Sequence, residues 1–135
     1  MKYLVLSFMM LLGAVGVKAQ DVAYLNSQLQ EVKKREAEFV RELTQFAPDK
    51  FSARVVDLKG KVKFEGIYTL VEGKMYEHGE FIFYHPNGKI ESRGFYEYGV
   101  KTGTWERYDA VGNKKADKYY NPESAALIRS AMKKQ

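Results

Sequence analysis

The chain has 135 residues, with 22 basic and 17 acidic side chains and no cysteine, and its formal net charge is +5. The absence of cysteine excludes a disulfide framework, a thiol nucleophile and a lipid-anchoring cysteine. The charge is mild and lysines are interleaved with glutamates, which argues against the one-faced basic surface that binds nucleic acid.

Residues 1–19 have the pattern of a secretory signal peptide. A single early lysine precedes an apolar run from Tyr3 to Val17, and small residues lead up to Gln20. The alternative is a retained membrane anchor, but the run is shorter than the roughly 20 apolar residues that a spanning helix needs. We therefore predict cleavage after Ala19, a secreted or periplasmic location, and no transmembrane span after leader removal.

Removal of the leader would leave 116 residues, which suits one domain with an ordinary core. The leader contains two lysines and no acid, so the mature chain has 20 basic and 17 acidic residues and a net charge of +3. Its pattern changes twice along the chain. We predict a helical segment at 20–50, β-hairpin repeats at 51–120 and a C-terminal helix at 121–135.

The segment from Val22 to Phe46 shows helical periodicity. Its apolar residues recur at steps of four and three, with Glu36 at the missing step, and they are Leu25, Leu29, Val32, Phe39, Leu43 and Phe46. Pro48 ends the pattern because proline disfavours helix in the residue before it. We predict a long amphipathic helix that packs across a sheet; the alternative is a homodimer through this helix as a coiled coil.

From Phe51 onward, short β-prone runs alternate with turn signals. Three four-residue segments, Asp57–Gly60, His85–Gly88 and Asp109–Gly112, occupy equivalent places and end in glycine. A glycine that closes such a turn can adopt the positive φ that returns the chain as a hairpin. We predict about six antiparallel strands in meander order, the first of them, Phe51–Gly60, as a degenerate capping strand. The structural turn glycines are Gly60, Gly79, Gly88, Gly103 and Gly112.

Two ten-residue stretches share one frame at a spacing of 24 residues. GEFIFYHPNG begins at Gly79 and GTWERYDAVG begins at Gly103, and each has glycine, an aromatic residue, tyrosine and glycine at the same offsets. The return strands place a tyrosine at their ninth position, as Tyr68, Tyr96 and Tyr120. Units this small cannot bury their own apolar faces, so the pattern indicates a stacked array.

The frame G-x-[FW]-x-x-Y-x-x-x-G-[KN], followed by G-[FY]-Y, resembles the bacterial variant of the MORN repeat, a unit also labelled as an antitoxin component. The resemblance covers Gly60 to Tyr120, and Lys118 stands where the last copy would carry a glycine. It implies an elongated antiparallel sheet that associates with proteins or membrane surfaces and catalyses no reaction. The matching residues are Gly79, Phe81, Tyr84, Gly88, Gly94 and Tyr96 in one copy, and Gly103, Trp105, Tyr108, Gly112 and Tyr120 in the next.

The chain has two histidines, His78 and His85. Together with Glu77 and Glu80 they could be drawn as a metal or acid–base cluster, but both fall at turn positions and no third ligand converges on them. The chain also lacks the motifs of nucleophilic hydrolases and phosphate-binding loops. We predict structural histidines, no enzyme activity, and no catalytic, metal or cofactor site.

The aromatic pairs of the repeat have an odd spacing. Residues three apart in a regular strand point to opposite faces, so Phe81 and Trp105 should separate from the tyrosines that follow them. We predict that Phe81 and Trp105 are buried under the helix, while an exposed binding ladder on the other face contains Tyr68, Tyr84, Tyr96 and Tyr108. The alternative is that all of these rings are core and stack across strands.

These features predict an α+β chain: a long N-terminal amphipathic helix, an antiparallel β-meander of repeated hairpins and a short C-terminal helix. They favour a non-catalytic, extracytoplasmic binding or scaffold module whose partner is another protein or an envelope surface. The alternatives are a toxin-neutralising, immunity-type inhibitor and a peripheral membrane-surface protein.

Overall fold

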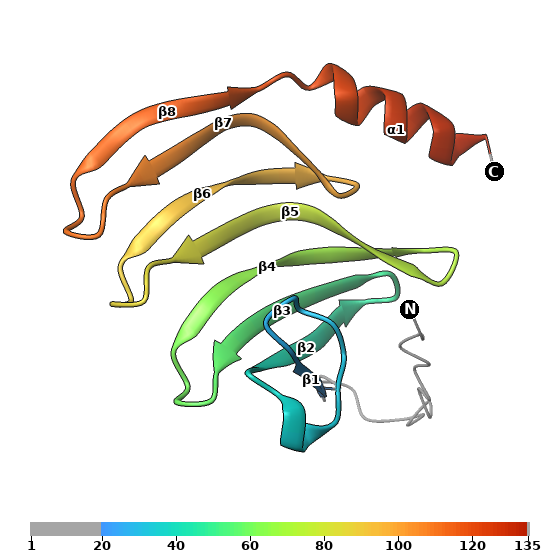
Figure 1. Cartoon of the computed structure of the whole chain (residues 1–135). Coiled ribbons are helices and arrows are strands. Elements are labelled where there is room, and N and C mark those ends of the chain that lie inside the picture. Colours follow the sequence, from blue (N-terminus) through green and yellow to red (C-terminus); the bar gives the residue numbers. More distant parts are fainter. Residues whose placement is uncertain (1–19, 135) are drawn as a thin grey trace.

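The computed structural model describes residues 20–134, and the predicted signal peptide lies outside this range. Eight strands form one antiparallel sheet in which every strand pairs with its neighbours in sequence (Figure 1). The elements are β1 (Gln20–Leu25), the 3₁₀ turn η1 (Lys34–Glu36), β2 (Phe39–Ala47), β3 (Lys50–Asp57), β4 (Val62–Val71), β5 (Lys74–Tyr84), β6 (Ile90–Glu97), β7 (Val100–Tyr108), β8 (Lys114–Tyr120) and α1 (Glu123–Lys133).

The prediction of a long N-terminal helix is wrong, and with it the α+β class and the helical segment at 20–50. Residues 22–46 form β1, η1 and β2, and the two strands pair antiparallel with Leu25 opposite Phe39. Leu25 and Leu43 are buried, whereas Leu29 and Phe46 are 40% and 49% exposed, so the predicted stripe never forms one surface. A homodimer through a coiled coil of this segment is therefore excluded as well, because the segment forms no α-helix.

The residues between β1 and β2 fold back on the C-terminal end of β1 and pair with its outer edge there. The Asn26 side chain accepts hydrogen bonds from the backbone N–H groups of Gln28 and Gln30, which turns the chain back on itself. Leu25 and Glu31 then form a β-bridge, and the N–H of Val32 donates to the Tyr24 carbonyl at 2.9 Å. These contacts satisfy backbone groups that an open edge would leave free.

Because β1 and β2 precede it, β3 is an interior strand and not the predicted capping strand. The meander of hairpins itself is confirmed, with eight strands in place of about six. The short C-terminal helix is also present, as α1, which follows β8 and contacts β7 (Figure 1). Arg129 of α1 forms an ion pair with Glu97 at the end of β6. Among residues 20–134, no helix combines the length and apolarity needed to cross a membrane.

The three predicted turns have one geometry. The N–H groups of Gly60, Gly88 and Gly112 donate to the carbonyls three residues earlier at 2.9–3.0 Å, and the φ angles of these glycines are +85°, +87° and +95°. Neighbouring turns also touch: the Asn87 amide donates to the Ala110 carbonyl and the Lys89 ammonium donates to the Val111 carbonyl. The turns therefore stack along one side of the sheet.

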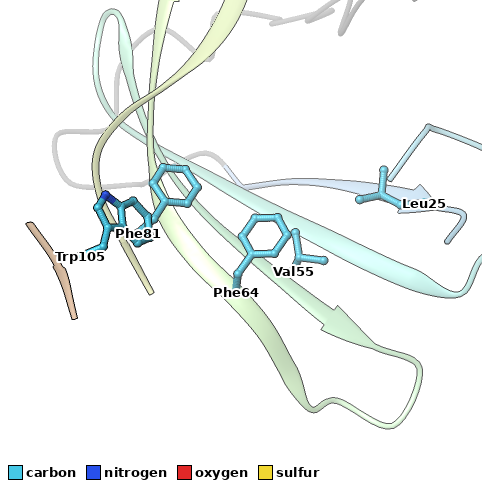
Figure 2. Packing of buried hydrophobic residues seen from close by; sticks show 5 residues of the cluster. All are labelled: Leu25, Val55, Phe64, Phe81 and Trp105. Carbon is cyan, nitrogen blue, oxygen red and sulfur yellow. The ribbon is translucent and has the colours of Figure 1, made fainter. Parts of the chain in front are cut away.

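The core explains why the repeat frame pairs glycines with aromatic residues. Gly66 lies directly opposite Phe81 in the β4–β5 register, and the Phe81 ring rests on it. The Trp105 ring rests in the same way on Gly94 of β6. Both rings are 1% exposed, and Figure 2 shows them in the cluster that includes Phe64. A glycine on each strand makes room for the ring that comes from the next strand.

We expect Gly66→Ala and Gly94→Ala each to lower the free energy of unfolding by about 1–3 kcal/mol, the usual cost of overpacking a core. A β-carbon at either position would lie well inside the 3.0 Å that real β-carbons keep from their neighbours. Chemical denaturation measures the effect. Combining Gly66→Ala with Phe81→Leu should cost less than the sum of the single changes, because the smaller side chain vacates the space. Wild-type stability of both alanine variants would contradict the ring-on-glycine packing.

The carboxylates of Asp57 and Asp109 predict a pH dependence of stability. Each accepts two backbone N–H bonds within its turn, and these bonds hold the pKa of both groups below the ordinary 3.8. A lowered pKa in the folded state means that this stabilisation is present above the ordinary pKa and is lost as the pH falls through the folded value.

Thermal melts between about pH 6 and pH 2 test this dependence. The double variant Asp57→Asn, Asp109→Asn should show a smaller acid loss of melting temperature than the wild type. Asp21→Asn, which removes a carboxylate outside the turns, controls for the change in charge. Identical acid profiles of the double variant and the wild type would contradict the role of the two carboxylates.

Candidate binding groove

The structure divides the four tyrosines that were predicted to form one exposed ladder. Tyr68 and Tyr96 lie on the same face as Phe81, with ring centroids 5.4 and 4.8 Å from the Phe81 centroid. Tyr96 also packs edge-on against Trp105 at 5.3 Å. Burial raises the pKa of Tyr96 to about 12 and that of Tyr68 further. The predicted placement opposite Phe81 and Trp105 is therefore wrong for these two, which belong to the aromatic core.

Tyr84 and Tyr108 instead bind carboxylates. The Tyr84 hydroxyl donates to Glu65 and the Tyr108 hydroxyl donates to Glu106 at 3.1 Å. Burial and the bond to Glu65 raise the pKa of Tyr84 to about 12. Both acceptors belong to a row of successive register partners that crosses six strands, namely Glu42, Arg54, Glu65, Ile82, Arg93 and Glu106.

This row lies on the face opposite Phe81, because its residues alternate along each strand with those of the aromatic core. Arg93 and Glu106 form an ion pair at 2.7 Å. A shallow hollow of about 490 Å³ lies over β2 to β5 on this face and is lined by Glu42, Glu65 and Glu80 together with Arg54. Three glutamates line this hollow against one arginine, so the hollow is acidic.

Both histidines make hydrogen bonds within the fold, but only His85 starts a turn, whereas His78, predicted at a turn, lies within β5. The ring of His78 lies against Tyr98, and its Nδ1 accepts the Tyr98 backbone N–H at 3.2 Å. Burial, assisted by Lys50, lowers the pKa of His78. The Nε2 of His85 lies 2.9 Å from the Tyr108 carbonyl. Within residues 20–134, no three histidines or carboxylates come close enough together to hold a metal ion.

The aromatic face opens into a groove at its C-terminal end. Its volume is about 530 Å³, and its lining comes from β6 to β8 and the turns that begin at His85 and Asp109. Four cations line the groove against two acids, Glu91 and Asp109. The cations are Lys101, Arg107, Lys115 and Lys118. We call this surface the basic groove.

The indole of Trp105 lies in the wall of the basic groove and is held on two sides. Its Nε1–H donates to the Phe95 carbonyl at 3.2 Å, which fixes the ring plane. The Lys101 ammonium lies 4.6 Å from the indole centroid and 5.5 Å from the Tyr120 centroid, within the range of a cation–π contact. Because Trp105 is 1% exposed, the groove presents its cations and the half-buried Tyr120 ring, with the indole buried beneath Lys101.

The sequence patterns did not identify the basic groove, because its cations come from separate positions on β7 and β8. One signal was visible: Lys118 replaces the glycine that the repeat frame requires. In the structure Lys118 of β8 is the register partner of Trp105. It takes the place of a glycine against which an aromatic ring from a following strand would pack. The irregular position in the last copy is thus part of the candidate site.

No family model, no curated protein and no solved structure matches this chain.

We expect Lys101→Met to lower the free energy of unfolding by about 0.5–2 kcal/mol, because it keeps the apolar stem and removes the charge above the rings. It should also change the fluorescence emission of Trp105, the only tryptophan in the chain. Lys101→Arg should retain most of the stability, since guanidinium also stacks on aromatic rings. Lys115→Met, which removes a charge from the same groove, is the matched control; an equal effect of both methionine variants would contradict the cation–π contact.

Proposed function

We propose that this protein is a non-catalytic binding or scaffold module that works outside the cytoplasm and that engages another protein through the basic groove. The observation that carries the proposal is the convergence of four cations in one open groove, beside the half-buried Tyr120 ring and above the buried Trp105 indole. Aromatic rings and arginine are enriched in protein interfaces, because they combine a large contact area with directed polar groups.

The form of the groove supports binding over catalysis. It is an open hollow at the end of a single-layer sheet, whereas sites for small substrates are usually enclosed. Both histidines already make hydrogen bonds to the backbone, which leaves them in structural roles. The repeat frame adds to the proposal, since its resemblance to the MORN variant implies association and no reaction.

The pattern of residues 1–19 supports the extracytoplasmic location. A partner in the cell envelope or outside the cell follows from the same pattern. Neutralisation of a toxin would be one form of such binding, and the groove does not favour it over other protein partners.

Site-specific photo-crosslinking in the producing cell tests the proposal. A photoreactive residue at position 118, in the basic groove, should give a discrete crosslinked protein in the envelope or the medium. The same residue at position 54, on the opposite face, is the matched control and should give none. Equal crosslinking from both positions would contradict the proposal.

N-terminal sequencing of the exported form tests the extracytoplasmic location, and the sequence should begin at Gln20. Intact chains in the cytoplasm would contradict this location.

A further inference from the structure

The two edges of the sheet differ. The outer edge of β1 carries the bridge between Leu25 and Glu31, whereas β8 pairs only with β7 among residues 20–134. Every residue of β8 except Tyr120 is exposed, and Tyr119 is 67% exposed. In Figure 1 β8 is the last strand of the sheet, and α1 continues from its end without running along it. The outer N–H and C=O groups of β8 are thus free to pair with another strand.

The open edge borders the basic groove. Lys118 is the register partner of Trp105, and Lys115 is the partner of Arg107. Directly opposed residues in an antiparallel pair project to the same face, so both lysines stand on the groove side of β8. Asp117, the one acid of this strand, pairs with Lys114 at 3.5 Å. A strand added beside β8 would therefore meet cations on its groove face.

We infer that β8 accepts an extended acidic segment of the partner protein as a ninth strand of the sheet. Backbone hydrogen bonds to the edge of β8 would supply general affinity, and alternate side chains would select the sequence. Acidic residues at every second position of the segment would reach Lys115, Lys118 and Arg107. This inference rests on the proposed function and specifies the chemistry of the partner.

The length of β8 sets the size of the segment. Seven residues at roughly 3.3 Å each span about 23 Å, so a segment of about seven residues covers the edge. Three or four of its side chains face the groove, which is close to the number of cations there.

The charge of β8 disfavours a second copy of this chain as the added strand. β8 contains three lysines and one aspartate. Each such strand has a net charge of +2, so two of them placed side by side would repel each other. An acidic segment converts the same lysines into favourable pairs.

Titration of the purified mature protein with synthetic peptides tests the inference. The probe is a capped peptide of four Glu-Val repeats, and the readouts are calorimetry and the emission of Trp105 at low and high salt. Binding should be saturable and should weaken with salt, because exposed charges are screened. A Lys-Val peptide of the same length should not bind.

Two further peptides separate strand addition from simple charge attraction. Each carries the Glu-Val sequence with every second backbone nitrogen methylated, one in each of the two possible alternations. Strand addition requires that at least one of them loses binding by about tenfold or more, because its donors toward β8 are removed. If both methylated peptides bind as tightly as the unmethylated peptide, the ninth strand is overturned, whereas the proposed binding through the groove is not.

Variants locate the contact. Lys115→Glu with Lys118→Glu should weaken acidic-peptide binding by about tenfold or more, and both positions are exposed, so the fold should persist by thermal melting. Lys33→Glu with Lys59→Glu makes the same charge change at exposed sites outside the groove and should leave binding within about twofold. No binding of the Glu-Val peptide, or binding to anionic phosphatidylserine vesicles alone, would overturn the inference.

Discussion

The contact between an aromatic ring and a glycine of the neighbouring strand is the interaction on which the rest of the structure depends. Phe81 rests on Gly66 and Trp105 rests on Gly94, so neither ring can be buried unless the preceding strand is in place. In return, each glycine gains a large apolar cover that its own strand cannot provide. Since no described helix lies across this face, the single sheet obtains its core from rings that shield one another. Register is specified as well, because a slip of one residue would place a side chain under each ring.

The same packing rule explains why the two faces differ in what they can bind. On one face, glutamates and arginines oppose each other from strand to strand, and the hollow over β2 to β5 is lined by three glutamates and one arginine. On the other face, the aromatic row ends at Lys118, where a glycine would have received a further ring. The last rings are covered by the Lys101 ammonium, and the surrounding cations outnumber the acids. The groove at the end of the array thus has more cations than acids.

The N-terminal segment shows how a local pattern can mislead. Steps of three and four from Leu25 to Phe46 are compatible with a helical stripe, but a helix is stable only if its apolar face has a surface to cover. Pairing with β3 stabilises a different structure, because it gives β2 backbone hydrogen bonds on both sides and gives β1 hydrogen bonds to β2. Leu43 and Phe46, three residues apart in β2, point to opposite faces, so Leu43 is buried and Phe46 is exposed. In a helix the same two residues would share one face. Nonlocal pairing therefore overrode the local periodicity.

Turn chemistry by itself determined the hairpin turns that close at Gly60, Gly88 and Gly112, because their positive φ is a local property of the backbone. Gly79 and Gly103, which were also predicted as turn glycines, have positive φ but lie within β5 and β7, so this part of the prediction is wrong. The burial of Phe81 and Trp105 also followed from their size and from the frame that they share. Only the tertiary structure decided the partners of the tyrosines, because strand pairing brings Tyr68 and Tyr96, each two residues after a glycine that a ring covers, against Phe81. It alone assembled the basic groove, because lysines and arginine from β7 and β8 become neighbours through strand pairing, and no spacing along the chain encodes that pairing.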